Sequence, residues 1–312
     1  MKKFVFAFTP SPALDLSGTV DRIKPNEKSY VYDEIRSPGG NAINAARILT
    51  RLKIPVIASG FLGGSTGEEI KHLLKKEGVK SSFIKIGGHS RICVTVSNKS
   101  DHKQTRLTFP GPHILKNEKQ ALVRFLQDQQ SISFLIIGGS LPPGFGPDDA
   151  TRIMKVAERK GIKCIVDSPG PVLRKLIRSG PFFIKPNLDE FQELTGTQVK
   201  SIAAVRKAAL PFLRRTPYIC ISSVEGGALL VTSEGCFWGR IPKVAIKSSV
   251  GAGDSMVGAM TAQFFKENPA ADDVLRWGLA GAAATLEKPG TAFGTAERIF
   301  YLYTKTKVQK IE

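Results

Sequence analysis

Cysteine, histidine and tryptophan are scarce in this chain, and their scarcity excludes several kinds of site. The 312 residues include 4 cysteines, 4 histidines and 2 tryptophans. The cysteines lie far apart, without the spacing of a zinc site or the density of a disulfide framework: Cys93, Cys164, Cys220 and Cys236. We therefore expect free thiols in a reducing compartment, and neither metal-ligand nor triad roles for the histidines.

Long hydrophobic runs are also absent from the sequence. The apolar run from Phe4 to Phe8 is shorter than the apolar core of a secretory signal, and Pro10 follows it closely. Charged residues interrupt every other apolar segment, whereas a membrane span requires about 18 consecutive apolar residues. Hydrophobic residues still make up 42% of the chain, enough for a large core. We expect a cytoplasmic globular protein with no membrane partner.

Acidic residues are outnumbered by basic ones. The chain has 27 Asp and Glu against 45 Lys and Arg, a formal net charge of +18. Such a charge can attract nucleic acid by neutralising phosphates. The basic residues are scattered, however, without an Arg/aromatic RNA signature or a helix-turn-helix reader. We expect a solvated basic surface and no nucleic-acid partner, while attraction of an anionic small substrate explains the same charge.

Short apolar segments alternate with helical patterns along the chain. Strands are expected at residues 4–8, 55–61, 134–140, 162–168, 182–187 and 218–223, and helices at 41–52, 68–77 and 148–160. This order predicts a three-layer α/β/α core around a mostly parallel sheet. Two polar, strand-like segments, residues 10–35 and 86–108, predict an antiparallel excursion that could form a small β lid. The core then comprises residues 1–9, 36–85 and 109–312.

Polar residues and glycines follow the first expected strands, where α/β proteins bind ligands. Asp15 comes after the first strand, and the motif PGGNAIN opens a helix. Gly39 and Gly40 would let the backbone approach a ligand closely, and Asn44 can donate to and accept from hydroxyl groups. Glycine pairs also mark ordinary turns, so this motif alone leaves both interpretations open.

Two later motifs are equally ambiguous by themselves. In IIGGSLPPG, Ser140 and nearby amides could hold a substrate group, or the prolines could simply stiffen a strand exit. In KPNLDE, Asn187 and Glu190 lie about one helical turn apart. They could hold Mg²⁺ directly or through water, or Asn187 could cap a helix.

The motif SSVGAGDSMVGAM, residues 248–260, is the most informative. Amides of Gly251, Ala252 and Gly253 at a helix N-terminus would favour an anion. Asp254 beside them suits a general base that takes a proton while the amides stabilise a transferring phosphoryl group. The alternative is that Asp254 caps the helix. P-loop, third-glycine Rossmann and HRD/DFG signatures are absent.

The motifs together carry a family resemblance. PGGNAIN, IIGGSLPPG, IVDS, KPNLDE and SVGAGDSMVGAM occur in the order and spacing of the ribokinase-like (PfkB) carbohydrate kinases, and the match spans nearly the whole chain. The combination of SLPPG, KPNxxE and GAGDS resembles the phosphosugar branch of that family. The resemblance implies a ribokinase-like fold whose β lid pairs with its twin in a homodimer.

The resemblance also implies a role for each matching residue. Asp254 would be the catalytic base, with Gly251, Ala252 and Gly253 as its anion hole. The sugar-phosphate site would comprise Asp15, Lys28, Gly39, Gly40, Asn44, Arg91 and Ser140, with Lys28 reaching in from the lid. The ATP site would comprise Lys185, Asn187, Glu190, Ser222 and Gly227, with Asn187 and Glu190 as candidate ligands of Mg²⁺; K⁺ is a further candidate cofactor.

The sequence departs from the family pattern in three places. Val224 stands where the Ser-x-Gly-x-x-Gly pattern of the ATP loop has glycine. The region that the resemblance places near adenine and the monovalent cation differs from the family by carrying Lys288 and Pro289. In PGGNAIN, Asn41 and Ala42 stand where relatives have glycine-richer sequences.

The activity that the resemblance implies is ATP- and Mg²⁺-dependent phosphorylation of the C1 hydroxyl of fructose 6-phosphate, giving fructose 1,6-bisphosphate in glycolysis. Tagatose 6-phosphate kinase and 1-phosphofructokinase activities remain open. Adenosine kinase and ribokinase activities fit less well, because Lys28 and Arg91 suit a phosphorylated substrate. From other classes, a non-catalytic sugar-phosphate sensor and a basic nucleic-acid binder remain, and the presence of Asp254 beside GAG argues against the sensor.

Overall fold

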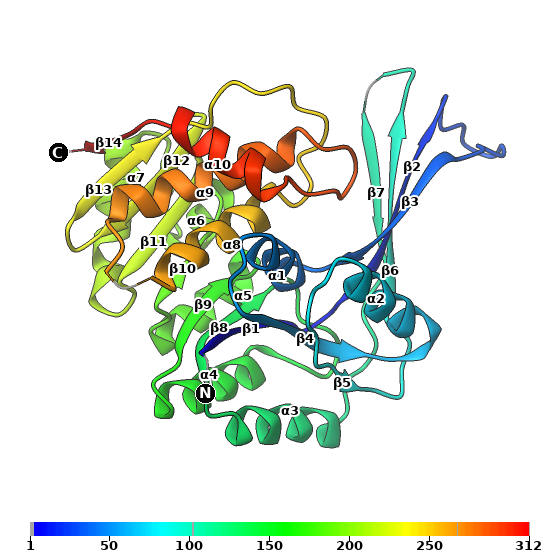
Figure 1. The fold of residues 1–312 in the computed structure, drawn as a ribbon, viewed down its shortest axis with the longest axis horizontal. Coiled ribbons are helices and arrows are strands. Elements are labelled where there is room, and N and C mark those ends of the chain that lie inside the picture. Colours follow the sequence, from blue (N-terminus) through cyan, green and yellow to red (C-terminus); the bar gives the residue numbers. More distant parts are fainter. Residues whose placement is uncertain (1–2, 102, 267, 312) are drawn as a thin grey trace.

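The large sheet of the computed structural model, which describes residues 3–101, 103–266 and 268–311, is 10-stranded (Figure 1). Its strand order is β14-β13-β12-β11-β10-β9-β8-β1-β4-β5. The strands are β1 (Phe4–Thr9), β4 (Val56–Leu62), β5 (Ile84–Lys85), β8 (Ile132–Gly138), β9 (Lys163–Asp167), β10 (Phe183–Ile184), β11 (Tyr218–Val224), β12 (Gly227–Thr232), β13 (Gly235–Gly239) and β14 (Val308–Ile311). Pairing is parallel from β5 to β11 and antiparallel from β11 to β14. The expected mostly parallel sheet is therefore confirmed.

Helices cover both faces of this sheet. One buried cluster joins it to α1 (Asn41–Arg51), α2 (Gly64–Lys76), α8 (Ala252–Phe264) and α9 (Ala271–Leu286), and α10 (Ala296–Lys305) packs on α9. The opposite cluster includes α3 (Lys116–Asp128), α4 (Pro147–Arg159), α5 (Gly170–Leu176), α6 (Leu188–Thr195) and α7 (Ile202–Ala209). The predicted three layers are thus present. Among the described residues, no helix is long and apolar enough to cross a membrane.

The burial pattern of α4 shows why such segments are helical. Ala150, Ile153, Met154 and Ala157 are buried and recur at the spacing of one helix face. Pro147 stands at the start of the helix, where its missing N–H costs nothing. At the same end, the side chain of Asp149 accepts from the backbone N–H of Gly146, which is the half of a capping box that glycine allows. Local sequence and core burial therefore favour the same conformation.

Some elements differ from the sequence-based expectation. The strand expected at residues 182–187 is only β10, because Pro186 has no N–H to donate to a ladder. The antiparallel edge from β12 to β14 was not predicted. Its β14 comes from the end of the chain, so this pairing depends on residues that are about 70 positions apart in sequence, a contact that local patterning does not reveal.

A second, four-stranded sheet projects from the body of the molecule (Figure 1). We call it the small sheet; its order is β3 (Tyr32–Gly39), β2 (Ala13–Val20), β6 (Arg91–Asn98) and β7 (Gln104–Thr108). The outer pairs are antiparallel, but the central β2 and β6 run parallel. The expected antiparallel excursion is therefore confirmed for the two outer pairs. The central pair differs because both segments leave the core in the same direction. β3 also continues to Gly39, beyond the boundary expected after residue 35.

The close contact between α1 and α8 depends on Gly258. A Cβ at this position would lie 2.8 Å from the carbonyl oxygen of Ala45 and 2.9 Å from Cβ of Ile48. Backbone cannot move aside as a flexible side chain can. The missing side chain therefore allows α8 to lie where its first turn faces the start of α1, so that Asp254 meets Asn44.

Replacing Gly258 with alanine should destabilise the protein. Overpacking costs about 1–3 kcal/mol, against the roughly 1 kcal/mol that alanine returns through helix propensity. We expect the midpoint of urea unfolding to fall in Gly258→Ala and to stay unchanged in Gly87→Ala, where a Cβ would meet nothing within 4 Å. Equal midpoints for the two variants would contradict this account of the α1–α8 contact.

Candidate active site

The N-terminus of α8 presents unpaired amides to an open cleft. Gly251 is the N-cap, with φ 76° and ψ 0°, a left-handed conformation that glycine adopts without steric cost. The first hydrogen bond of the helix runs from Ser255 N to Gly251 O, at 2.9 Å. The amides of Ala252, Gly253 and Asp254 precede that bond, so they can bind an anion. Asp254 lies in the first turn and is not the N-cap, so the capping alternative is wrong.

A buried lysine faces the same helix end. The Nζ of Lys185 lies 3.3 Å from the position that a Cβ on Gly253 would occupy, and 3.3 Å from Oδ1 of Asp167. Burial acts to lower the pKa of Lys185, but the carboxylates of Asp167 and Asp254 outweigh it and raise the pKa above its ordinary value. Lys185 is therefore a fixed positive charge beside the free amides.

Asp254 is held by a hydrogen bond from α1. Nδ2 of Asn44 donates to Oδ2 of Asp254 at 2.7 Å. Burial and then the negative charge of Asp167 raise the pKa of Asp254 to about 7, while the Asn44 bond and Lys185 act to lower it. The residue remains partly exposed at the surface of the protein. A carboxyl with such a pKa can exchange a proton near neutral pH.

The start of the small sheet brings further predicted residues to this cleft. Asp15 on β2 is packed directly against Gly39 on β3, where a Cβ would collide with the carboxylate. Burial raises the pKa of Asp15 to about 6, and the positive charges of Arg91 and Arg47 oppose that shift. Arg91 on β6 donates to the carbonyl oxygen of Ser11 from Nε and Nη2, at 3.2 and 3.1 Å.

The remaining predicted sugar-site residues lie at different distances from this cluster. Gly40 is the N-cap of α1, with φ 124°. Ser140 is exposed just after β8, whose Gly138 packs against Ala42 in the first turn of α1. Lys28 lies in the exposed loop beyond Val20, which ends β2 about 17 Å along the strand from Asp15. Within one chain, Lys28 is therefore not brought to the cluster.

Four of the five predicted ATP residues, all except Glu190, line a neighbouring cavity of about 540 Å³. Lys185, Asn187, Ser222, Gly227, Ala252 and Gly253 contribute to its polar part, and Ile241, Met256, Leu279 and Ala282 to its apolar part. Such a volume and mixed lining are typical of small-molecule sites.

The hairpin between β11 and β12 has Val224, the last residue of β11, at the position where glycine was expected. Positive φ values fall on Ser223 (66°), Glu225 (46°) and Gly226 (74°), and not on Val224. Val224 is fully buried in the core, so a large apolar side chain stabilises this position. Valine is therefore compatible with the loop, because the left-handed turn is made by its neighbours.

Asn187 and Glu190 form a capping box at the start of α6. Oδ1 of Asn187 accepts from Glu190 N at 2.8 Å, and Oε2 of Glu190 accepts from Asn187 N at 2.9 Å. Among the described residues, no group of three or more His, Cys, Asp and Glu side chains could hold a metal ion. The donors present fit Mg²⁺ only as it is commonly held, through water and bound phosphates.

Two residues that sequence reasoning missed organise the cluster. Asp167 ends β9 and pairs with Lys185; its position in the motif IVDS, at the end of a strand, was a usable signal. Arg47, 3% exposed, donates bidentately to Glu77 at 2.6 and 2.9 Å and from Nη1 to Oδ1 of Asn44 at 3.3 Å. With its oxygen held by Arg47, the amide of Asn44 must turn its nitrogen toward Asp254. Spacing along a helix carries no signal for that role.

Removing the Asn44 amide should raise the pKa of Asp254 further. This hydrogen bond stabilises the charged carboxylate, so its loss makes the carboxyl harder to deprotonate. A bond of this kind changes the acid dissociation constant about tenfold. We expect carboxyl ¹³C NMR titration of Asn44→Ala to show the shift. The matched control is Asn41→Ala, because Nδ2 of Asn41 donates to Asp167 instead, at 3.1 Å. An unchanged or lower pKa of Asp254 in Asn44→Ala would contradict the assigned contact.

Comparison with known proteins places this geometry in a family. A family model described as pfkB family carbohydrate kinase matches residues 11–298. The ATP-dependent 6-phosphofructokinase isozyme 2 of Escherichia coli (strain K12) is 34% identical over 288 residues, covering 91% of this chain and 93% of the relative. The 1-phosphofructokinase of Bacillus subtilis (strain 168) is 29% identical over 315 residues, 98% and 100% of the two chains.

A solved structure gives the same answer for the fold. The crystal structure of phosphofructokinase-2 from Escherichia coli in complex with substrates and products superimposes with a TM-score of 0.92, at 31% identity, covering 97% of this chain and 99% of that one. The fold is thus ribokinase-like, as the motifs implied. Since both the family model and these relatives span most of its length, the chain belongs to the pfkB family of carbohydrate kinases.

Proposed function

We propose that this protein transfers the γ-phosphoryl group of ATP to the C1 hydroxyl of fructose 6-phosphate, giving fructose 1,6-bisphosphate and ADP. The observation that carries the proposal is the placement of one carboxyl, Asp254, beside both an anion-binding helix end and the buried cation Lys185. A base next to an anion site is what phosphoryl transfer to a hydroxyl requires.

In this proposal Asp254 accepts the proton of the attacking hydroxyl. Its raised pKa allows it to take a proton as the hydroxyl oxygen bonds to phosphorus, and general-base catalysis of this kind contributes about 10²–10⁴-fold. The amides of Ala252 and Gly253 and the ammonium of Lys185 would stabilise the negative charge on the transferring group. Positioning and electrostatics supply most of the remaining acceleration.

ATP would occupy the cavity beside α8, with its phosphates toward Gly253 and Lys185. Asn187 and Glu190 would hold the hydrated Mg²⁺ that accompanies the nucleotide, while Ser222 and Gly227 line the same cavity. A divalent cation supplies charge neutralisation of the phosphate oxygens when bound. K⁺ remains a proposed additional cofactor in the region of residues 286–294.

The sugar would bind between α1 and the small sheet. Asp15, Gly39, Gly40 and Asn44 would contact its hydroxyl groups, and Arg91 with Ser140 would bind its existing phosphate. We propose that the small sheet acts as a lid and pairs with its twin in a homodimer. Its exposed apolar side chains support that pairing, among them Tyr30, Val31, Leu107 and Phe109 in or beside its strands. Lys28 would then reach the phosphate from the partner's lid.

Tagatose 6-phosphate and fructose 1-phosphate are the competing substrates. The two relatives described above are named for different activities at similar identity, so overall similarity does not separate the sugars. The same frame of hydroxyl-binding residues would serve each of them. Tagatose 6-phosphate differs from fructose 6-phosphate in the stereochemistry of one hydroxyl, and fructose 1-phosphate differs in the end that carries the phosphate.

Turnover of a substrate panel tests the proposal. ADP release with Mg²⁺-ATP should be fast with fructose 6-phosphate and slow with tagatose 6-phosphate, fructose 1-phosphate, fructose and adenosine. Asp254→Asn should lower kcat by at least ~10²-fold without a matching change in KM. Asp189→Asn, the same change in the first turn of α6, should leave kcat unchanged.

Preference for another phosphosugar would correct the substrate but keep the mechanism. If none of these compounds is turned over, the non-catalytic sugar-phosphate sensor remains as the interpretation. Salt-dependent binding of DNA or RNA without turnover would favour the nucleic-acid binder instead.

The pH dependence of kcat/KM should report Asp254 in the free enzyme. Because the base must be deprotonated and its pKa is raised to about 7, activity should rise with pH through that value. The second ionisation of a substrate phosphate has a pKa of ~6. If it affects kcat/KM, the same change with pH would persist in the residual activity of Asp254→Asn. A profile near pH 7 that is the same in both proteins would argue against Asp254 as the base.

A further inference from the structure

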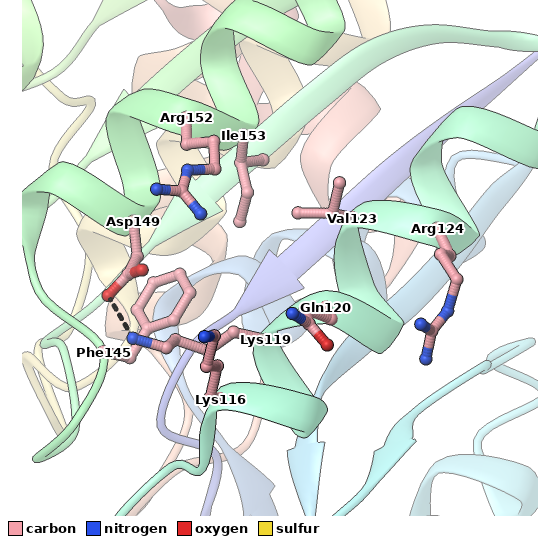
Figure 2. A pocket seen from close by; sticks show the side chains of 9 residues that line it. All are labelled: Lys116, Lys119, Gln120, Val123, Arg124, Phe145, Asp149, Arg152 and Ile153. Carbon is pink, nitrogen blue, oxygen red and sulfur yellow. Dashed lines mark hydrogen bonds and ion pairs between the residues drawn. The ribbon is translucent and has the colours of Figure 1, made fainter.

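A cleft between α3 and α4 lies apart from the site described above. It encloses about 460 Å³ and is lined by nine residues, which Figure 2 shows as sticks. Arg152 and Ile153 on α4 face Lys119, Gln120 and Val123 on α3, with Phe145 at one end of the space. The proposed reaction uses none of these side chains.

The charge lining this cleft is predominantly positive. Lys116, Lys119, Arg124 and Arg152 contribute cations, and Asp149 is the single carboxylate among the lining residues. Asp149 is already engaged, since it pairs with Lys119 at 3.1 Å and accepts from Gly146 N at 3.0 Å. Within the described ranges, Lys116, Arg124 and Arg152 have no ion-pair partner. The cleft therefore has an excess of unpaired cations.

The apolar part of the cleft lining is rigid. Phe145 and Ile153 are each only 2% exposed, yet both contribute to the lining. The ring of Phe145 is fixed by edge contacts with Phe8 and Phe61, at centroid distances of 6.0 and 5.3 Å. The surface that a ligand would meet is thus preformed.

We propose that the α3–α4 cleft binds a small molecule that carries a phosphate group on a ring or short hydrocarbon body. Arg152 would bind the phosphate through its planar donor pair, and Lys116 would add a point charge. The body would rest against Phe145, Ile153 and Val123. The volume lies within the range of about 300–1,000 Å³ that is usual for small-molecule sites.

Two hydrogen-bonded connections link this cleft to the sugar-phosphate residues. Phe145 N donates to Pro142 O at 3.1 Å, in the loop that starts at Ser140. On the α3 side, Oε1 of Glu118 accepts from Gly87 N at 2.9 Å, in the segment that leads to Arg91. A ligand that contacts Phe145 and Lys116 would therefore act on both phosphate-binding segments, so we assign the cleft an effector role. That role rests on the proposed function; binding itself does not.

Phenyl phosphate is a suitable probe because it combines a phosphate with an apolar ring. We expect calorimetric titration of the full-length protein to show saturable binding, tighter than for inorganic phosphate or phenol alone. Arg152→Glu should weaken it by at least about tenfold, the loss expected for a charge-assisted contact. Arg159→Glu is the matched control, since it makes the same charge change on α4 outside the cleft, and should bind as the wild type does.

Equal affinity in Arg152→Glu and Arg159→Glu, or no saturable binding, would overturn the proposed site. The effector role is tested separately by KM for fructose 6-phosphate, which saturating phenyl phosphate should change in the wild type and not in Arg152→Glu. Binding at the cleft without a change in KM would overturn the effector role. If no phosphosugar is turned over, the proposed function fails, and the titration still decides whether the cleft binds phosphate compounds.

Discussion

The ion pair between Lys185 and Asp167 is the interaction on which the rest of the site depends. Both side chains are almost completely buried, and Asp254 adds a second carboxylate to the same enclosed space. Without Lys185, two like charges would face each other at low dielectric, and breaking a buried pair typically costs about 3–5 kcal/mol. With it, the carboxylate of Asp167 has an ion-pair partner, while Asp254 keeps a raised pKa. The same ammonium remains beside the free amides of α8, where a phosphoryl group would be held.

This cluster assembles because several elements end at one edge of the sheet. Asp167 ends β9 and Lys185 directly follows β10, and these parallel strands deliver both side chains to the same side. α1 and α8 then contribute Asn44 and Asp254, and their contact is close only because Gly258 has no side chain. Core packing therefore determines site geometry, because the spacing of α1 and α8 sets the distance between the amide of Asn44 and the carboxylate of Asp254.

Arg47 connects Asn44 to residues that lie outside the cluster around Asp254. It joins Glu77 to Asn44, and its guanidinium lies 4.4 Å from the ring centroid of Phe293. The ring of Phe293 in turn packs against Gly251, where a Cβ would collide with it. The N-cap of α8 and the partner of Asp254 are thus positioned by one buried side chain. Small changes at Arg47 would reach both at once, since packed interiors have little free volume.

Sequence patterns predicted most of this architecture, and their errors have a common cause. Strands β1, β4, β8, β9 and β11 were expected from short apolar segments, and helices α1, α2 and α4 from helical patterns, while glycine-rich motifs marked the loops that meet at the cleft. The parallel pairing of β2 with β6 and the edge strand β14 were not found, because they join segments far apart in the chain. The capping box of Asn187 and Glu190 was one of two open interpretations, and its letters alone did not decide it.

The sequence by itself determined which chemical groups are present and where the chain turns. The glycines of GAGDS predicted a turn before a helix, because glycine adopts left-handed backbone conformations without steric cost. Whether Asp254 caps that helix or lies inside its first turn was decided by the structure, which places Gly251 at the N-cap. Only the tertiary structure decided the raised pKa of Asp254 and the orientation of Asn44. Those properties arise from desolvation and from charges such as Asp167 that adjoin Asp254 in space while lying 87 residues away in the chain, and no local pattern encodes a distance of that kind.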